Sequence, residues 1–329
     1  MGDHDALFKR IFSVPAYAAE LLRVVLSPEL VAAIDLTSLE LVPFGTVNAA
    51  LVHRHVDLLL RARRRDGRGF VYFVTEHRSS PDARMPLRFM DYTHRVWVNH
   101  LLEHPDEVQL PPVISIVVHH GTLGWTAPRS LHEMVTDLVA LPGAARYVPE
   151  LRIALLDLAF ATDEDLTGWT SSPVTRVALW LLRDGRDIEA LLGGLQGFAA
   201  ALARVVTLHP DEAMLFMSYI LRVAGERSAH EVRRIVLQHV PNAEEPMASA
   251  AEQLIEEGLQ RGLRQGVAQG LVEGRAALHD ALHTLLVQRF GTVDPVSEAR
   301  LHDADLAELK RLTGRVLGAP SLADVFASS

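Results

Sequence analysis

HVDLLLRARRRDGRGFVYFVTE, residues 55–76 of the chain, holds two short apolar runs separated by a link rich in arginine and glycine. The link contains Asp66-Gly67, and an Asp-Gly pair between strand-like runs predicts a β-hairpin, because the turn needs positive φ angles. Asp57 then lies near the start of one strand, and Glu76 lies at the end of its antiparallel neighbour. We therefore expect the two carboxylates at the same end of the hairpin.

The segments around the hairpin alternate between helix and strand patterns. An apolar stripe, Leu7, Phe8, Ile11 and Phe12, predicts an N-terminal helix, and Pro15 suits the first turn of a second helix over residues 16–26. A third helix is expected over 86–102, with Leu87, Met90, Trp97 and Leu101 on its buried stripe. Apolar runs at 113–118 and 151–158 read as strands. This order predicts an α/β fold with a mixed sheet flanked by helices.

The rest of the chain has an almost wholly helical pattern. Helices are expected over 174–182, 188–206, 211–223 and 229–239, and the segment 241–246 breaks the pattern. Beyond it, glycines recur every fourth residue, at 258, 262, 266, 270 and 274. We expect a core at 1–168, a helical region at 169–245 and a glycine-repeat helical tail at 246–329. Small residues on one stripe favour close approach of a second backbone, so the tail is a candidate for homo-oligomerisation; a flexible extension is the alternative.

Composition excludes several classes of function. The 329 residues include no cysteine, which excludes disulfides, thiolate nucleophiles and Cys-ligated metals and fits a cytoplasmic location. Charged residues interrupt the apolar runs, so no membrane span is expected. A net charge of -9 argues against a protein that coats DNA, although a nuclease needs only local positive charge. The sequence has no P-loop, GxGxxG or GxSxG motif, and four histidines, His53, His55, His119 and His120, lack the spacing of a zinc site.

The paired carboxylates Asp57 and Glu76 are the candidate chemical centre. Mg²⁺ keeps several waters and takes one or two carboxylates plus a substrate phosphate, so such a pair is the smallest site that suits it. Taken alone, Asp57 reads more readily as an ordinary strand-end residue than as a metal ligand. Asp5 and Lys9, one helical turn apart, read as an intrahelical ion pair.

Several motifs together resemble one known family. They are His4-Asp5-xx-Phe8-Lys9, His55-x-Asp57-Leu58-Leu59, Glu76-His77-x-Ser79-Ser80-Pro81-Asp82, Met85-Pro86-x-Arg88-xxx-Tyr92, Pro111-Pro112-Val113-Ile114, His120-Gly121 and the glycine-punctuated tail. In this order they resemble the Rpn family of recombination-promoting nucleases and transposase-like proteins, across nearly the whole chain. The resemblance implies a restriction-endonuclease-like PD-(D/E)xK core that cleaves DNA with Mg²⁺ or another divalent cation.

The resemblance also implies roles for residues of the hairpin. Asp57, Glu76 and the backbone carbonyl of His77 would bind the metal, and Asp57, Glu76 and Arg78 would be catalytic. Arg78 departs from the motif, which has lysine in general and often glutamine in this family. Because a guanidinium does not readily lose its proton, we expect Arg78 to act electrostatically on phosphate.

Two further sets of basic residues are candidates for DNA contact. Arg61, Arg63 and Arg65 belong to the densest basic cluster of the chain, which would either bind phosphate or be a solvated hairpin that discourages edge aggregation. Arg88 and Tyr92 are one helical turn apart and would point at the site or form a surface pair. The sequence thus predicts a metal-dependent DNA endonuclease linked to recombination or transposition; the alternative is a catalytically weakened nuclease fold that binds DNA or assembles.

Overall fold

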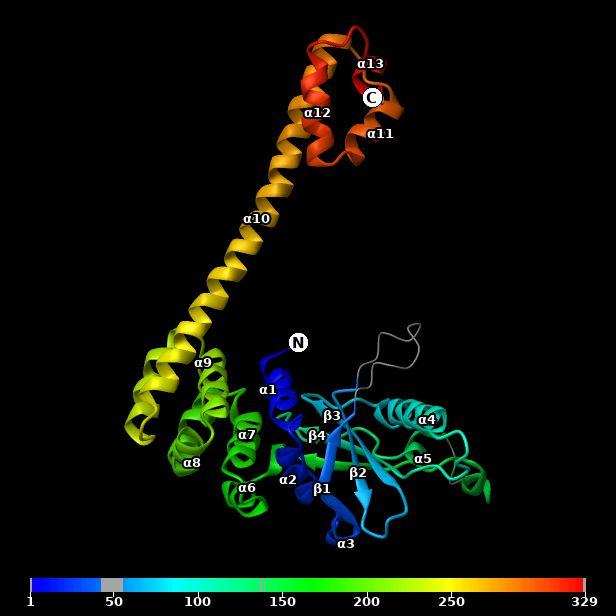
Figure 1. The fold of residues 1–329 in the computed structure, drawn as a ribbon, viewed down its shortest axis with the longest axis vertical. Helices are drawn as coiled ribbons and strands as arrows, with labels where there is room; N and C mark the ends of the chain where they lie inside the picture. The colour runs from blue at the N-terminus through cyan, green and yellow to red at the C-terminus, as the bar shows by residue number, and fades with distance from the viewer. Residues whose placement is uncertain (1, 43–55, 137, 139, 328–329) are drawn as a thin grey trace. The chain divides into compact units, whose positions relative to one another are not determined.

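A computed structural model describes residues 2–42, 56–136, 138 and 140–327 (Figure 1). His53 and His55, singled out from the sequence, lie outside the described residues. The chain divides into two compact units, Met1–Ala251 and Glu252–Ser329. The first unit therefore contains both segments expected as a core and as a helical region. The three-part division itself stays a prediction.

A five-stranded mixed sheet is the centre of the first unit. Its strands lie in the order β1-β2-β3-β4-β5, and β1 to β3 are antiparallel whereas β3, β4 and β5 run parallel. Their bounds are β1 Ile34–Leu41, β2 Leu58–Arg64, β3 Phe70–Arg78, β4 Val113–His119 and β5 Ile153–Asp157. The predicted mixed sheet with flanking helices is confirmed.

The hairpin β2–β3 forms as predicted. Its link turns through Gly67 and Gly69, whose φ angles are 73° and 85°, and the backbone N–H of Arg64 donates to the carbonyl of Gly69. Leu58 faces Thr75 across the two strands. This register leaves Asp57 and Glu76 at the same end of the hairpin, also as predicted.

Strand β1 was not predicted from the sequence. The apolar residues Ile34 and Leu36 are buried on one face of the strand, but the register of its pairing with β2 shifts between Asp35 and Glu40. An irregularity of this kind breaks the period-2 alternation by which a strand is recognised.

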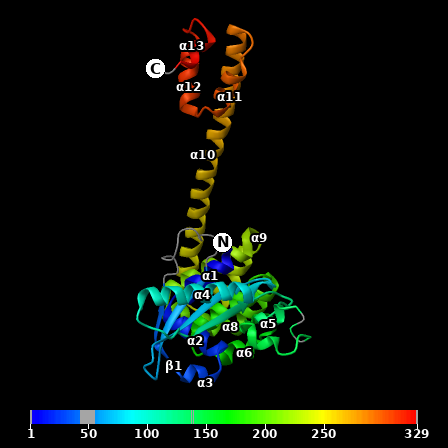
Figure 2. The same ribbon diagram turned by 90° about the vertical axis from the view of Figure 1, so that its right-hand side faces the viewer.

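Helices cover both faces of the sheet. On one face α1 (Asp3–Phe12) packs on α2 (Pro15–Val25), which contacts β1 and β5; α3 (Pro28–Ala32) leads into β1. On the other face α4 (Met85–Glu103) packs against β3 and β4 and runs across the strands (Figure 2). Successive residues of β3 therefore face different helices, and this alternation separates the side chains of Glu76 and His77.

The buried stripe predicted for α4 was wrong. Leu87, Met90 and Leu101 are exposed, and the core beneath the helix contains Phe89 and Val96. The helix carries apolar residues on two sides, so spacing alone did not identify the inward one. The inward stripe also contains the residues that point at the end of the hairpin, Arg88 and Tyr92.

Helices α7 (Pro173–Asp184), α8 (Ile188–Leu208) and α9 (Pro210–His239) complete the first unit and confirm the predicted helical region. Short elements connect them to the sheet: α5 Leu131–Met134, η2 Ala144–Tyr147, η3 Leu158–Phe160 and α6 Asp163–Trp169. By length and composition α8 could cross a membrane, although the charged residues Glu189 and Arg204 interrupt its apolar sequence. It packs between α7 and α9, with Phe198 stacked on Trp180, and a buried core helix passes the same test.

The second unit has its own core. The long helix α10, Glu244–Phe290, crosses the boundary between the units, and its last turns pack with α11 (Pro295–Asp303), α12 (Leu306–Val316) and α13 (Leu322–Phe326). Leu282, Leu286, Leu309 and Leu312 are buried there. The five repeat glycines lie on α10 before this core, and a Cβ added to any of them would meet no neighbouring atom within 4 Å.

Candidate functional site

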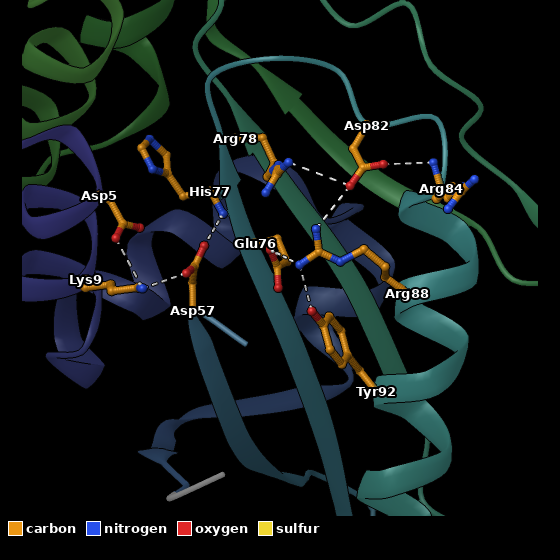
Figure 3. Close-up of polar contacts among 10 residues, drawn as sticks. All are labelled: Asp5, Lys9, Asp57, Glu76, His77, Arg78, Asp82, Arg84, Arg88 and Tyr92. Atoms are coloured by element: carbon orange, nitrogen blue, oxygen red, sulfur yellow. Dashed lines mark hydrogen bonds and ion pairs between the residues drawn. The ribbon is translucent and has the colours of Figure 1, made fainter. Parts of the chain in front are cut away.

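Asp57 and Glu76 lie side by side at the carboxyl end of β3 (Figure 3). Both line one pocket of about 420 Å³, together with His77, Arg78 and Arg88. The parallel strands β3 and β4 end at the same edge, so residues that follow β4 reach this pocket too. The sequence-predicted centre is thus a real hollow at a sheet edge.

The carboxylate of Asp57 is turned toward helix α1. Its Oδ2 accepts a hydrogen bond of 2.9 Å from the backbone N–H of His77, and its Oδ1 lies 2.8 Å from Nζ of Lys9. Nζ of Lys9 also lies 3.3 Å from Asp5. Burial would lower the pKa of Lys9, but the hydrogen bond and charge of Asp57 outweigh it and the pKa is raised. The Asp5–Lys9 pair is therefore more than an intrahelical contact, because it also holds Asp57.

Glu76 is almost completely buried, with 2% of its surface exposed. Its Oε2 lies 3.5 Å from Nη2 of Arg88, and its buried Oε1 has no hydrogen-bond partner among the described residues. Burial, and next the charge of Asp57, raise the pKa of Glu76 to about 7 against the opposing charge of Arg88. A buried carboxylate oxygen without a partner costs at least about 1–3 kcal/mol, so the site favours a cation or proton at this position.

Arg88 connects Glu76 to its surroundings on α4. Its Nη2 donates to the hydroxyl of Tyr92 at 2.9 Å, and its Nη1 lies 3.0 Å from Asp82. Arg78 approaches the same Asp82 carboxylate at 3.6 Å. Both arginines therefore stand beside the carboxylate pair with a third carboxylate holding them, an arrangement visible in Figure 3.

The position of Arg78 bears on the two functions left open by the sequence. Arg78 pairs with Asp82 and does not close a salt bridge over Asp57 and Glu76. Nor do three or more His, Asp or Glu side chains converge on one ion-sized position anywhere in the part of the chain that the structure describes. A closed salt bridge from Arg78 over both carboxylates, the arrangement expected of a weakened enzyme, is therefore not formed by these residues.

Stacked rings occupy the side of the pocket toward α1. His77 stacks between Phe8, at 4.6 Å, and His120, at 4.4 Å, with interplanar angles of 8° and 7°. His4 tilts against His120 at 4.9 Å. Burial lowers the pKa of His77 to about 3 and that of His120 to about 2, with neighbouring histidines and Arg186 adding to both shifts. Both rings are neutral at physiological pH.

Histidine pairs do not build a zinc site in the described residues. His119 is fully buried, and its Nδ1 lies 2.8 Å from Asp157. His120, the next residue, stacks on His77 instead. The two successive histidines therefore contact different partners and do not converge on one position. The expectation against zinc stays a prediction, since His53 and His55 are outside the described residues.

The basic residues of the hairpin lie away from the carboxylates. Arg61 pairs with Glu40 at 2.7 Å and covers the ring of Phe70 at 4.6 Å. Arg63 is opposite Phe70 in the hairpin, and Arg65 follows the last residue of β2. Along the extended strand Arg61 is four residue steps from Asp57, roughly 13 Å, and Arg65 is eight steps away, roughly 26 Å. A DNA contact at Arg61, Arg63 and Arg65 would therefore be distant from the chemical centre.

Lys9 and Asp82 pair with side chains of the pocket and Arg186 lines it, but none of the three was predicted to act there. Asp82 belongs to the Ser79-Ser80-Pro81-Asp82 motif, which could have drawn attention to it. Lys9 was attributed to a pair with Asp5 alone. Arg186, between α7 and α8, also lines the pocket, and no local pattern indicates that it would.

Comparisons with known proteins cover most of this unit. The Transposase_31 family model, described as "Putative transposase, YhgA-like", matches residues 2–206. Recombination-promoting nuclease RpnD of Escherichia coli O157:H7 is 28% identical over 251 residues, 76% of this chain and 93% of the relative.

Two relatives from Escherichia coli K12 differ in what their names say. Recombination-promoting nuclease RpnA is 26% identical over 255 residues, 78% of this chain and 84% of the relative. Inactive recombination-promoting nuclease-like protein RpnE is also 26% identical over 255 residues, 78% of this chain and 82% of the relative. No solved structure matches the chain.

Proposed function

This chain belongs to the Transposase_31 family of YhgA-like transposases, and we propose that its first unit is a DNA endonuclease that hydrolyses phosphodiester bonds with a divalent cation. Its relatives are named recombination-promoting nucleases, so it is a member of a nuclease family. One relative is named inactive, and activity therefore has to be argued from the site.

The buried, unpartnered Oε1 of Glu76 carries the proposal. A carboxylate with 2% exposure, a second carboxylate beside it and a pocket opening onto both form an oxygen-rich position that lacks positive charge on one side. Mg²⁺ fits this donor set, because it accepts one or two carboxylates and completes its shell with water and substrate phosphate. Asp57, Glu76 and the backbone carbonyl of His77 would hold it.

The bound ion would lower the pKa of an attacking water and stabilise negative charge on the phosphate. The protein residues have separate tasks around it. Arg88 keeps Glu76 oriented and is itself fixed by Tyr92 and Asp82. Arg78 stands at the pocket with part of its side chain exposed, where its guanidinium would contact phosphate oxygens. The hydrogen bond from His77 N–H fixes Asp57 at the strand end.

A plasmid-nicking assay with and without Mg²⁺ tests the proposal. Wild type should nick supercoiled DNA only with the cation. Glu76→Gln and Asp57→Asn should each lose at least about a hundredfold in rate, since each leaves the ion short of a negative ligand. Asp91→Asn is the matched control, because Asp91 pairs with Arg95 on α4 and does not line the pocket. Undiminished cleavage in both carboxamide variants would contradict the proposal.

The alternative, a weakened nuclease fold that binds DNA without cutting, makes a different prediction in the same assay. Such a protein would retard the plasmid in a gel with or without Mg²⁺ and leave it supercoiled. The inactive relative keeps this possibility open.

A further inference from the structure

The side of the pocket toward α1 differs from the carboxylate side, because its side chains bear nitrogen atoms and not carboxylate oxygens. His77 and His120 are brought together because β3 and β4 are parallel neighbours, and the backbone N–H of His120 donates to the carbonyl of Arg78. Arg186 arrives from the link between α7 and α8, and its Nη1 donates to the carbonyl of Ser79 at 3.5 Å. Three separate parts of the chain thus place nitrogen-bearing side chains around one hollow.

His120 is buried yet chemically unsatisfied. It is 3% exposed, it lines the pocket, and neither ring nitrogen has a hydrogen-bond partner among the described residues. Nε2 of His77 is unpartnered in the same way. His77 stacks between Phe8 and His120, which fixes the planes of both imidazoles, so rotation cannot readily bring these nitrogens to other partners. A buried polar group in this state is able to hydrogen-bond to a ligand that enters the pocket.

Arg186 gives this side a net positive charge. No carboxylate forms an ion pair with it in the described ranges, whereas Lys9, Arg78 and Arg88 each have one. The imidazoles of His77 and His120 line the same pocket beside it, with the unpartnered nitrogens described above. A guanidinium with neutral N–H donors recognises an anionic oxygen, which accepts from both.

We propose that Arg186 and His120 form a subsite for a DNA backbone phosphate next to the scissile one. The inference rests on the proposed nuclease function, which places the reacting phosphate at Asp57 and Glu76 in the same pocket. The subsite phosphate does not react, and its binding fixes the position of the strand relative to the carboxylates. The α7–α8 link, beyond residue 168 where the sequence analysis ended the nuclease core, then supplies part of the DNA site.

The two residues should be distinguishable by their salt dependence. A cationic side chain that neutralises one phosphate contributes about 0.9 to the slope of log K against log salt concentration, because it releases counterion. At pH 8, above the ordinary histidine pKa of about 6.5, an imidazole contributes a hydrogen bond and no counterion release. Arg186→Gln should therefore lower both affinity and slope, whereas His120→Phe, which keeps a stacking ring, should lower affinity alone.

Fluorescence anisotropy with a labelled DNA duplex tests this in EDTA, where no cation-dependent cleavage interferes. At several salt concentrations, Arg186→Gln should weaken binding by roughly five- to tenfold and reduce the slope by about one. His120→Phe should weaken binding several-fold at an unchanged slope, with circular dichroism confirming its fold. Arg204→Gln is the matched control, an exposed arginine on α8 away from the pocket.

The outcomes separate this subsite from the proposed activity. If Arg186→Gln and Arg204→Gln behave alike in affinity and slope, or if wild type binds no DNA, the subsite is wrong. An unchanged affinity of folded His120→Phe would overturn the shared subsite as well. If wild type binds with the predicted dependence on Arg186 but does not nick plasmid with Mg²⁺, the subsite stands and the proposed activity falls.

Discussion

Nζ of Lys9 lies 2.8 Å from Oδ1 of Asp57, so an ammonium group already neutralises part of the negative charge that a divalent cation would bind. Lys9 and Lys310 are the only lysines in a chain otherwise supplied with arginine. Because the ammonium and a divalent cation attract the same oxygen, Lys9→Ala should tighten Mn²⁺ binding by roughly three- to tenfold. It should also slow DNA cleavage, since positive charge beside the phosphate is lost.

Calorimetric titration with Mn²⁺ and the nicking rate measure the two effects of Lys9→Ala separately. Lys310→Ala is the control, because Lys310 belongs to the second unit. Unchanged Mn²⁺ affinity would show that the ammonium does not compete with the cation. Faster cleavage would contradict the role of its charge.

Glu76 predicts a pH dependence of stability in the cation-free protein. Its folded pKa is raised from 4.5 to about 7, chiefly by burial. The folded state therefore holds a proton that the unfolded chain releases, and stability decreases as pH rises from about 4.5 to 7. Glu76→Gln removes this loss, so its Tm in EDTA should exceed that of wild type by several degrees at pH 8 and match it near pH 4.

Scanning calorimetry at the two pH values checks the Glu76→Gln prediction. Asp91→Asn, on the same helix as Arg88 but outside the pocket, provides the control for loss of a carboxylate. A Tm gain of equal size at pH 4 and pH 8 would attribute the effect to packing and not to ionisation.

Arg78 is expected to act through its charge. Its guanidinium pairs only loosely with Asp82 at 3.6 Å and lines the pocket. Arg78→Lys should then nick DNA within about threefold of the wild-type rate or faster, while Arg78→Ala should lose at least about tenfold. Arg84→Ala is the control, because Arg84 reaches Asp82 through its backbone N–H. If lysine and alanine are equally slow, the planar fork of arginine is required.

Local signals predicted the part of the site that one hairpin builds. Asp66-Gly67 determined the turn, and the turn determined that Asp57 and Glu76 share an end. Strand β1 was missed because its pairing with β2 is irregular, and the inward face of α4 was mistaken because both its sides are apolar. Spacing reports a face only where one side of an element is clearly more polar than the other.

The remaining pocket residues depend on neighbours distant in the sequence. His120 reaches His77 because β4 lies parallel to β3, and Arg186 reaches Ser79 because the α7–α8 link packs at this edge. Lys9 reaches Asp57 across 48 positions of chain, since helix α1 covers the end of the hairpin. No periodicity encodes such contacts; the motifs that contain Lys9 and His120 were recognised as motifs without their partners.

The glycine repeat of α10 predicts self-association. Ile255, Leu259, Leu263, Val267 and Leu271 form a row at four-residue spacing, each between 55% and 72% exposed, beside the row of glycines. Rows at this spacing are the ridges and grooves by which two helices pack. A second copy is the expected partner, because its ridge would fit the groove that the glycines leave open. Light scattering should show more copies per particle for the full chain than for a chain ending at Ala251. The shortened chain retains the buried Met247 and Ala250.

Substitution of the glycines distinguishes packing from flexibility. Gly262→Ala with Gly266→Ala adds methyl groups that meet no atom of the same chain, so it should stabilise the isolated helix by about 1 kcal/mol for each residue. If the glycines allow close approach of another copy, the same methyl groups fill the groove between the helices. The number of copies per particle should then fall toward that of the shortened chain. If the repeat is only a flexible extension, helicity should rise by circular dichroism while the full and shortened chains keep equal oligomeric states. A variant whose helix is more stable but which associates less would therefore identify the repeat as an interface.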